Sequence, residues 1–196
     1  MKKAILGAAL LFSPLLAMAG NWPVTVKDMD NRTVTVTQEP QRIILQDGRD
    51  ILTLAVLERD NPFAKVVAWN NLPKKQDTET WNVLKRKWPE ADKILDMKFS
   101  DQGNVDLETV ISRHPDLMIA QLRAKPSLVQ SGVLAKLDAL HVPVVFVDYE
   151  LHPVENTMPS IAMLGKVLGQ SERAQAYINF YQQRLDTIHQ RLAKVE

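Results

Sequence analysis

The chain has 196 residues, with 24 lysine and arginine residues against 23 aspartate and glutamate residues and a formal net charge of +1. This balance lacks the basic excess that is typical of nucleic-acid binding proteins. The absence of cysteine excludes disulfides, a cysteine nucleophile and attachment of a lipid through a thiol.

The first 19 residues have the pattern of a secretory signal peptide. Two lysines follow Met1, an apolar run covers residues 4–16, and Ala17-Met18-Ala19 forms a small-residue cleavage site. A membrane anchor is the alternative, but a segment that spans a bilayer needs about 20 apolar residues. We therefore expect a mature chain that starts at Gly20, lies in the periplasm and is not membrane-anchored. Its length suits one domain.

The mature chain begins with the pattern of a β-hairpin. Residues 24–26 and 33–36 alternate apolar and hydroxyl-bearing side chains on either side of Asp30-Asn31. Short apolar runs then predict buried strands at residues 42–45, 65–69, 94–95, 117–120 and 142–147.

Helices are expected between these strands, because apolar residues there recur three and four positions apart. The predicted helices cover residues 51–57, 78–88, 106–113, 126–140 and 154–168. Residues 70–76 are mostly polar and contain Pro73, so we expect a loop there. Strands that alternate with helices predict an α/β, Rossmann-like fold with a mainly parallel sheet.

Residues 171–196 have the pattern of one long amphipathic helix. At about 1.5 Å per residue it would be about 35 Å long. A coiled-coil arm is the alternative interpretation of this pattern. The apolar positions recur at alternating spacings of four and three, at Ala174, Ile178, Tyr181, Leu185, Ile188, Leu192 and Val195.

Candidate binding residues follow from the predicted topology, because ligands of open α/β sheets bind beyond the carboxyl ends of the strands. Arginine and lysine there would bind anionic oxygen atoms, and aromatic side chains would cover rings. The alternative is that these are ordinary surface-loop residues, as we expect for the basic residues at 74–75 and 85–87. The candidates are Gln46, Arg49, Trp69, Asn70, Lys98, Gln121, Arg123, Tyr149 and His152.

Five segments also carry a family resemblance. They are residues 28–36, residues 40–44, the stretch GNVDLETVISRHPDLMIA at 103–120, LDALHVPVVFVD at 137–148, and LGKVLG with ERA between 164 and 174. In this order they resemble the periplasmic binding proteins of ABC importers for iron-siderophore complexes, haem and vitamin B12, of the class with a helical backbone.

The resemblance implies two α/β lobes that are joined by one long helix, with the ligand between them. Residues 20–170 would form the N-terminal ligand-binding lobe and residues 171–196 the interlobe helix. We therefore expect a truncated chain from which the second lobe is absent. The implied function is capture of an iron complex, a ferric siderophore, and its delivery to a permease in the inner membrane, with no cofactor of the protein's own.

Glu108 has a role implied by the resemblance alone. In this family a glutamate at the corresponding motif position lies on the lobe surface and pairs with arginines of the permease. The alternative is an ordinary exposed glutamate, since Glu108 follows Leu107 on the predicted helix and points away from the apolar face.

Other functions remain as alternatives. The four histidines lack the spacing of a metal site, and haem ligation by Tyr149 or His152 stays open, so haem and cobalamin are alternative ligands. The chain has no G-x-S-x-G motif and no phosphate-binding glycine loop, and we expect no enzymatic activity. A periplasmic α/β enzyme and a non-functional remnant are the remaining hypotheses.

Overall fold

The computed structural model describes residues 22–99, 107–193 and 195. The predicted signal peptide at residues 1–19 lies outside these ranges, as do residues 103–106 of the segment that carries the family resemblance. None of the helices in the described ranges is both long enough and apolar enough to cross a membrane.

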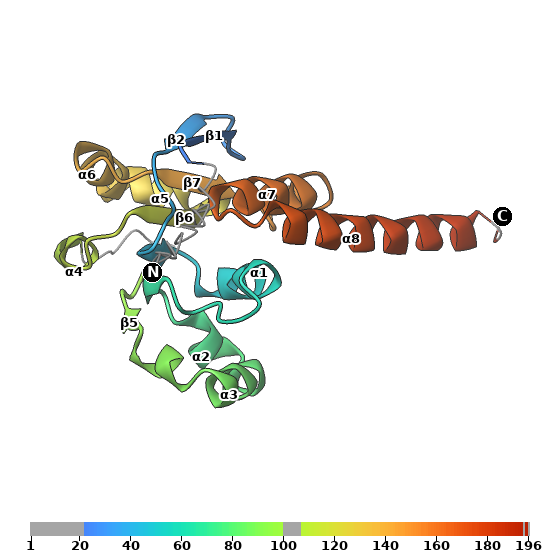
Figure 1. Ribbon diagram of the computed structural model, residues 1–196, viewed down its shortest axis with the longest axis horizontal. Coiled ribbons are helices and arrows are strands. Elements are labelled where there is room, and N and C mark those ends of the chain that lie inside the picture. The colour runs from blue at the N-terminus through green and yellow to red at the C-terminus, as the bar shows by residue number, and fades with distance from the viewer. Residues whose placement is uncertain (1–21, 100–106, 194, 196) are drawn as a thin grey trace, which may run out of the picture.

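A five-stranded parallel sheet forms the centre of the molecule, which confirms the predicted fold class (Figure 1). Every residue of the three adjacent strands at Ile43–Leu45, Leu117–Gln121 and Val144–Val147 is buried, as the continuous apolar runs predict. The strand order is β5-β4-β3-β6-β7, with β3 at Ile43–Leu45, β4 at Val66–Trp69, β5 at Leu95–Asp96, β6 at Leu117–Gln121 and β7 at Val144–Val147.

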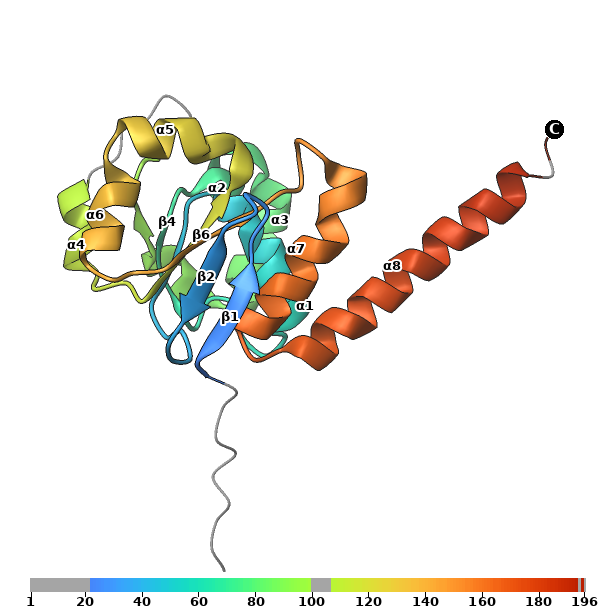
Figure 2. The same ribbon diagram turned by 90° about the horizontal axis from the view of Figure 1, so that it is seen from above.

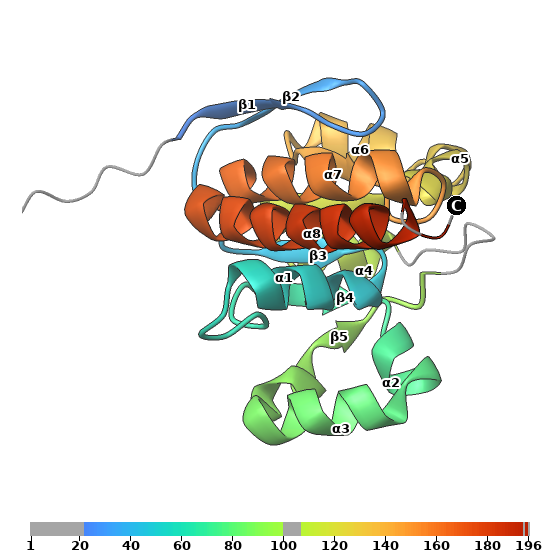
Figure 3. The same cartoon turned by 90° about the vertical axis from the view of Figure 1, so that its right-hand side faces the viewer.

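Helices pack against both faces of this sheet and form two apolar cores. The first core contains residues of α1 (Ile51–Leu57) and α7 (Pro153–Val167), and α3 (Thr78–Lys87) joins it through Trp81 and Leu84 beyond the β5 edge (Figure 3). The second core contains residues of α4 (Leu107–Ser112), α5 (Lys125–Gln130) and α6 (Val133–Ala139).

The predicted hairpin is confirmed as β1 (Val24–Lys27) paired antiparallel with β2 (Thr33–Val36) (Figure 2). Asp28, whose side chain is buried, attaches it to the sheet. Its Oδ2 accepts from Nη2 of Arg32 at 2.6 Å and from the N–H of Phe146 in β7 at 3.2 Å. One carboxylate thus satisfies donors from the hairpin turn and from an edge strand.

The loop that we expected at residues 70–76 contains a short helix, α2 (Leu72–Gln76). Pro73 lies in its first turn, where a helix needs no N–H donor from that position. The N–H groups of Lys74 and Lys75 donate to the carbonyl of Asn71 at 3.0 and 3.3 Å. The periodicity argument missed this helix because five mostly polar residues show no apolar repeat.

The single helix expected at residues 126–140 is divided into α5 and α6. Gly132 separates them with a φ of 75°, in the left-handed region that glycine adopts at little cost. Its N–H donates to the carbonyl of Val129 at 3.1 Å and closes the turn. The chain therefore changes direction at Gly132, and both helices cover the second core.

The predicted long helix is present as α8 (Ser171–Leu192). It packs against α7 and α1 near its start and then projects away from the sheet (Figure 2). Within α8 only Ala174 is buried, whereas Phe180, Ile188 and Leu192 are exposed. Most of its apolar stripe therefore faces solvent.

Candidate functional site

The predicted binding loops meet at the carboxyl ends of β3, β6 and β7, three adjacent strands of the sheet. From β3 the chain crosses the face that carries α1 and reaches β4, whereas from β6 it crosses the opposite face through α5 and α6 and reaches β7. Strand order therefore reverses between β3 and β6. A reversal of this kind opens a crevice, and ligands of α/β sheets bind there.

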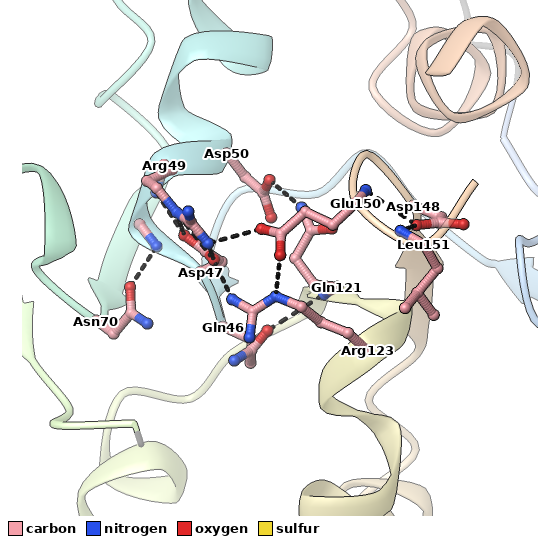
Figure 4. Close-up of polar contacts among 11 residues, drawn as sticks. Gln46, Asp47, Arg49, Asp50, Asn70, Gln121, Arg123, Asp148, Glu150 and Leu151 are labelled. Atoms are coloured by element: carbon pink, nitrogen blue, oxygen red, sulfur yellow. Dashed lines mark hydrogen bonds and ion pairs between the residues drawn. The ribbon is translucent and has the colours of Figure 1, made fainter. Parts of the chain in front are cut away.

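Four charged side chains form a cluster at this reversal point (Figure 4). Nη2 of Arg49 lies 2.5 Å from Oδ2 of Asp47 and 2.7 Å from Oε1 of Glu150. Nη2 of Arg123 lies 2.7 Å from the same Asp47 oxygen, and its Nε lies 2.8 Å from Oε2 of Glu150. Each carboxylate thus bridges the two guanidinium groups, and we refer to Arg49 and Arg123 as the arginine pair.

The two carboxylates of this cluster differ in their exposure to solvent. The side chain of Asp47 is 1% exposed and that of Glu150 is 39% exposed. Burial on its own would raise the pKa of Asp47, but hydrogen bonds from Arg49 and the charges of both arginines outweigh it and hold that pKa below its ordinary value. Asp47 is therefore a fixed negative charge beneath the arginine pair.

The loop after β7 is held in place by Asp148. This buried carboxylate accepts hydrogen bonds from the N–H groups of Glu150, Leu151 and His152 at 3.1, 2.8 and 3.1 Å. Burial opposes its ionisation, yet the hydrogen bonds from Asn156 and from these N–H groups lower the pKa of Asp148. The backbone that carries Glu150 is thereby ordered, and its side chain extends toward the arginine pair (Figure 4).

Two buried glutamines connect the ends of β3 and β6. Oε1 of Gln46 accepts from the N–H of Gln121 at 3.2 Å, and Nε2 of Gln121 donates to Oδ1 of Asp50 at 2.5 Å. Complete burial, with a contribution from the charge of Asp47, raises the pKa of Asp50 well above its ordinary value. The pKa of Asp50 is therefore shifted in the opposite direction from that of its neighbour Asp47.

Gly48 allows the β3 loop to approach the β4 loop closely. A Cβ at this position would lie 2.0 Å from the carbonyl oxygen of Asn70, which is too close for any side chain. The N–H of Gly48 donates to Oδ1 of Asn70. The predicted site residue Asn70 thus supports the loop that carries Asp47 and Arg49.

An apolar cavity of about 200 Å³ adjoins Arg49. Arg49 lines it together with residues at the start of α1 and along α2 and α3. An anionic group at the arginine pair and an apolar group in this cavity would therefore share Arg49 as a neighbour. The apolar lining comes mainly from Ile51, Leu52, Leu72, Pro73 and Leu84.

The structure brings together five of the nine predicted binding residues, namely Gln46, Arg49, Gln121, Arg123 and Tyr149, the last of which lies near Asp50. Trp69 is fully buried, with its ring centroid 5.9 Å from that of Phe63, and offers no surface to a ligand. Lys98 is exposed after β5, and no contact with the arginine pair is present among the described residues. His152 lines a separate hollow beside the hairpin.

Sequence reasoning selected the cations of this site but not its carboxylates. Asp47 and Glu150 lie in the predicted loops and Asp50 and Asp148 lie next to them, and each has a structural or electrostatic part in the arrangement. The available signal was that acidic residues lie within a few positions of the ends of β3 and β7, close to the arginines that follow β3 and β6. Opposite charges at adjacent strand ends indicate an ion-pair cluster.

Glu108 is exposed on α4, whose Val110 faces the second core. This confirms the expected orientation of the glutamate away from the apolar face. Glu108 is not part of the arginine cluster.

Comparison with known proteins identifies a family. A family model described as "Periplasmic binding protein" matches residues 47–196. No curated protein matches the chain.

Solved structures of several binding proteins share the fold. The TroA-like periplasmic binding protein FepB from Veillonella parvula is 24% identical, with a TM-score of 0.78 over 88% of this chain and 50% of its own. An Fe3+-hydroxamate transport protein from Saccharomonospora viridis is 18% identical, with a TM-score of 0.55 over 86% of this chain and 56% of its own. The molybdate periplasmic binding protein MolA from Haemophilus influenzae is 16% identical, with a TM-score of 0.60 over 78% of this chain and 48% of its own. This chain thus spans about half the length of each.

The protonation of Asp50 gives a prediction for the pH dependence of stability. Because its pKa is raised in the folded state, the folded chain retains a proton that the unfolded chain releases. The contribution of Asp50 to the free energy of unfolding is fully present below its ordinary pKa of 3.8, and it is lost as the pH rises through its folded-state pKa. Asp50→Asn keeps the shape and carries no charge, so we expect its melting temperature to exceed that of the natural chain at pH 7.

Thermal unfolding followed by circular dichroism between pH 4 and 8 tests this expectation. The difference in melting temperature between Asp50→Asn and the natural chain should shrink toward pH 4. Each kcal/mol of difference in unfolding free energy corresponds to about 2–4 °C. Asp138→Asn, a change at an exposed aspartate of α6, serves as the control. A difference for Asp50→Asn that stays constant across this range would show that Asp50 does not retain its proton on folding.

Proposed function

We propose, because the chain belongs to the periplasmic binding protein family, that it binds an anionic iron complex, a ferric siderophore, and delivers it to an ABC permease. The proposal includes export to the periplasm through the signal peptide at residues 1–19. It also assigns residues 20–170 to a ligand-binding lobe and α8 to the helix that connects this lobe to a second one. Support for the last assignment is that α8 projects beyond the lobe with an exposed apolar stripe.

The observation that carries the proposal is the arginine pair at the reversal of strand order. Two guanidinium groups from different loops converge on one point, with side chains that are 44% and 18% exposed. Guanidinium groups present planar arrays of donors that match the paired oxygen atoms of carboxylates and similar anions. A siderophore complex with anionic oxygens at its surface fits this donor set.

The apolar cavity beside Arg49 supports a ligand that is larger than a simple oxyanion. Binding sites for small molecules combine apolar walls with a few placed polar groups. An aromatic or aliphatic part of the ligand would enter the cavity while its anionic part contacts the arginine pair. The iron-hydroxamate and molybdate proteins with this fold indicate that the fold serves both kinds of ligand.

Haem ligation by Tyr149 has less support, because the hydroxyl oxygen of Tyr149 is buried. Burial raises the pKa of its hydroxyl, which opposes formation of the phenolate that would ligate iron. Cobalamin stays an alternative ligand, and measurement of its binding would test it. An enzymatic role has less support, because the family is one of transport-binding proteins.

For delivery to the permease we propose Glu108 as a docking residue. It is exposed on α4, and a carboxylate on an exposed helix is available to arginines of another protein. Its separation from the arginine cluster allows docking while the ligand is bound.

Neutralising either arginine should weaken binding of an anionic complex. Arg49→Gln and Arg123→Gln each remove a charged hydrogen-bond donor, which is worth about 1.5–3 kcal/mol and corresponds to about 10- to 100-fold in affinity. Quenching of tryptophan fluorescence by ferric catecholate, ferric hydroxamate, haem and cobalamin would measure the effect and identify the ligand. Arg113→Gln, at an exposed position outside the cluster, is the control. Unchanged affinity in both cluster variants would place the site elsewhere.

Removing the carboxylate of Glu108 should reduce uptake without changing ligand affinity. We expect Glu108→Ala, introduced into the natural gene, to bind the ligand as the natural protein does, since its side chain does not contact the site. Cellular uptake of the radiolabelled iron complex should fall several-fold, whereas Glu79→Ala on α3 should not change it. Loss of ligand binding in Glu108→Ala would refute the docking role.

A further inference from the structure

Glu150 fills the solvent side of the arginine pair. Its two carboxylate oxygens contact different guanidinium groups, Oε1 with Arg49 at 2.7 Å and Oε2 with Arg123 at 2.8 Å. Asp47 contacts the same two groups from the buried side. With both carboxylates in place, the two positive charges are matched by two negative charges, so the cluster offers little net attraction to an anion.

Of these two carboxylates, Glu150 is the one that can leave. The side chain of Asp47 is 1% exposed and also accepts the N–H of Arg49 at 2.9 Å. The side chain of Glu150 is 39% exposed, and its contacts with the arginine pair are made by the carboxylate at its end. Because Asp148 holds the backbone of residues 150–152, rotation of the Glu150 side chain opens the site without movement of the loop.

We infer that Glu150 occupies the position of the ligand's anionic group and thereby selects which ligands bind. This inference rests on the proposed function. A ligand must replace a carboxylate that bridges Arg49 and Arg123 with two oxygens, so it needs an anionic group with two adjacent oxygen donors, such as a carboxylate or a catecholate. Departure of Glu150 leaves one excess positive charge, which attracts an anion and gives a neutral complex no advantage.

The selection has a cost in affinity that can be measured. When the competent form of a site is populated only in part, the apparent affinity falls in proportion to that fraction. Exposed ion pairs each contribute at most about fivefold, so the two contacts of Glu150 would reduce the affinity for an anionic ligand by about 3- to 30-fold. Removal of the Glu150 carboxylate should therefore raise the affinity for an anionic ligand by the same factor.

Fluorescence titrations of the full chain with two probes test the inference. The probes are a ferric tris-catecholate, which is anionic, and a neutral ferric trihydroxamate. Glu150→Gln should bind the tris-catecholate about 3- to 30-fold more tightly than the natural chain, with no change for the trihydroxamate. Glu150→Asp keeps the charge, but its side chain is too short to bridge both arginines. Its affinity for the tris-catecholate should lie between that of the natural chain and that of Glu150→Gln.

A matched control and the possible outcomes separate this inference from the proposed function. Glu155→Gln removes the same charge at an exposed position in the first turn of α7, and should leave both affinities within twofold. If the natural chain binds the tris-catecholate and Glu150→Gln binds it equally or more weakly, the role of Glu150 is refuted while the proposed function stands. If neither binds either probe at millimolar concentration, both are refuted.

Discussion

The buried carboxylate of Asp47 is the constraint on which the candidate site depends. It accepts hydrogen bonds from Arg49, two residues away, and from Arg123, which is 76 residues away in the sequence. Two guanidinium groups that contact the same oxygen atom would repel each other if that anion were absent. A buried carboxylate, for its part, is stable in its ionised form only when it is paired and hydrogen-bonded. Asp47 and the arginine pair therefore stabilise one another in a single geometry.

The fold supplies the surroundings that make this geometry possible. Reversal of strand order between β3 and β6 places their loops side by side at the carboxyl edge of the sheet. Gln46 and Gln121 connect the ends of these strands, while Asp148 orders the loop after β7. Groups beneath the arginines are thus fixed by buried hydrogen bonds, whereas the side chain of Glu150 is exposed to solvent. A fixed base beneath an exposed carboxylate suits a site that must recognise a ligand and release it.

Much of the fold could be predicted from the sequence, because apolar runs and spacings report burial directly. The hairpin, the strands and α8 follow from such patterns, whereas α2 and the break at Gly132 depend on turn geometry that periodicity does not report. For the site, the strand-end rule located the loops, but Trp69 turned out to lie in the core, where its ring packs against Phe63 and Trp81. The pairing of Arg49 with Glu150, 101 residues away, depends on tertiary proximity that local sequence does not specify.

The central claim is that the arginine pair receives the anionic group of a transported iron complex. A crystal structure of the chain with a ferric tris-catecholate tests this most directly. We predict that ligand oxygens lie within hydrogen-bond distance of both Arg49 and Arg123, with Asp47 unmoved and the side chain of Glu150 turned toward solvent. A complex in which the ligand binds elsewhere, while Glu150 still bridges the two arginines, would contradict this account.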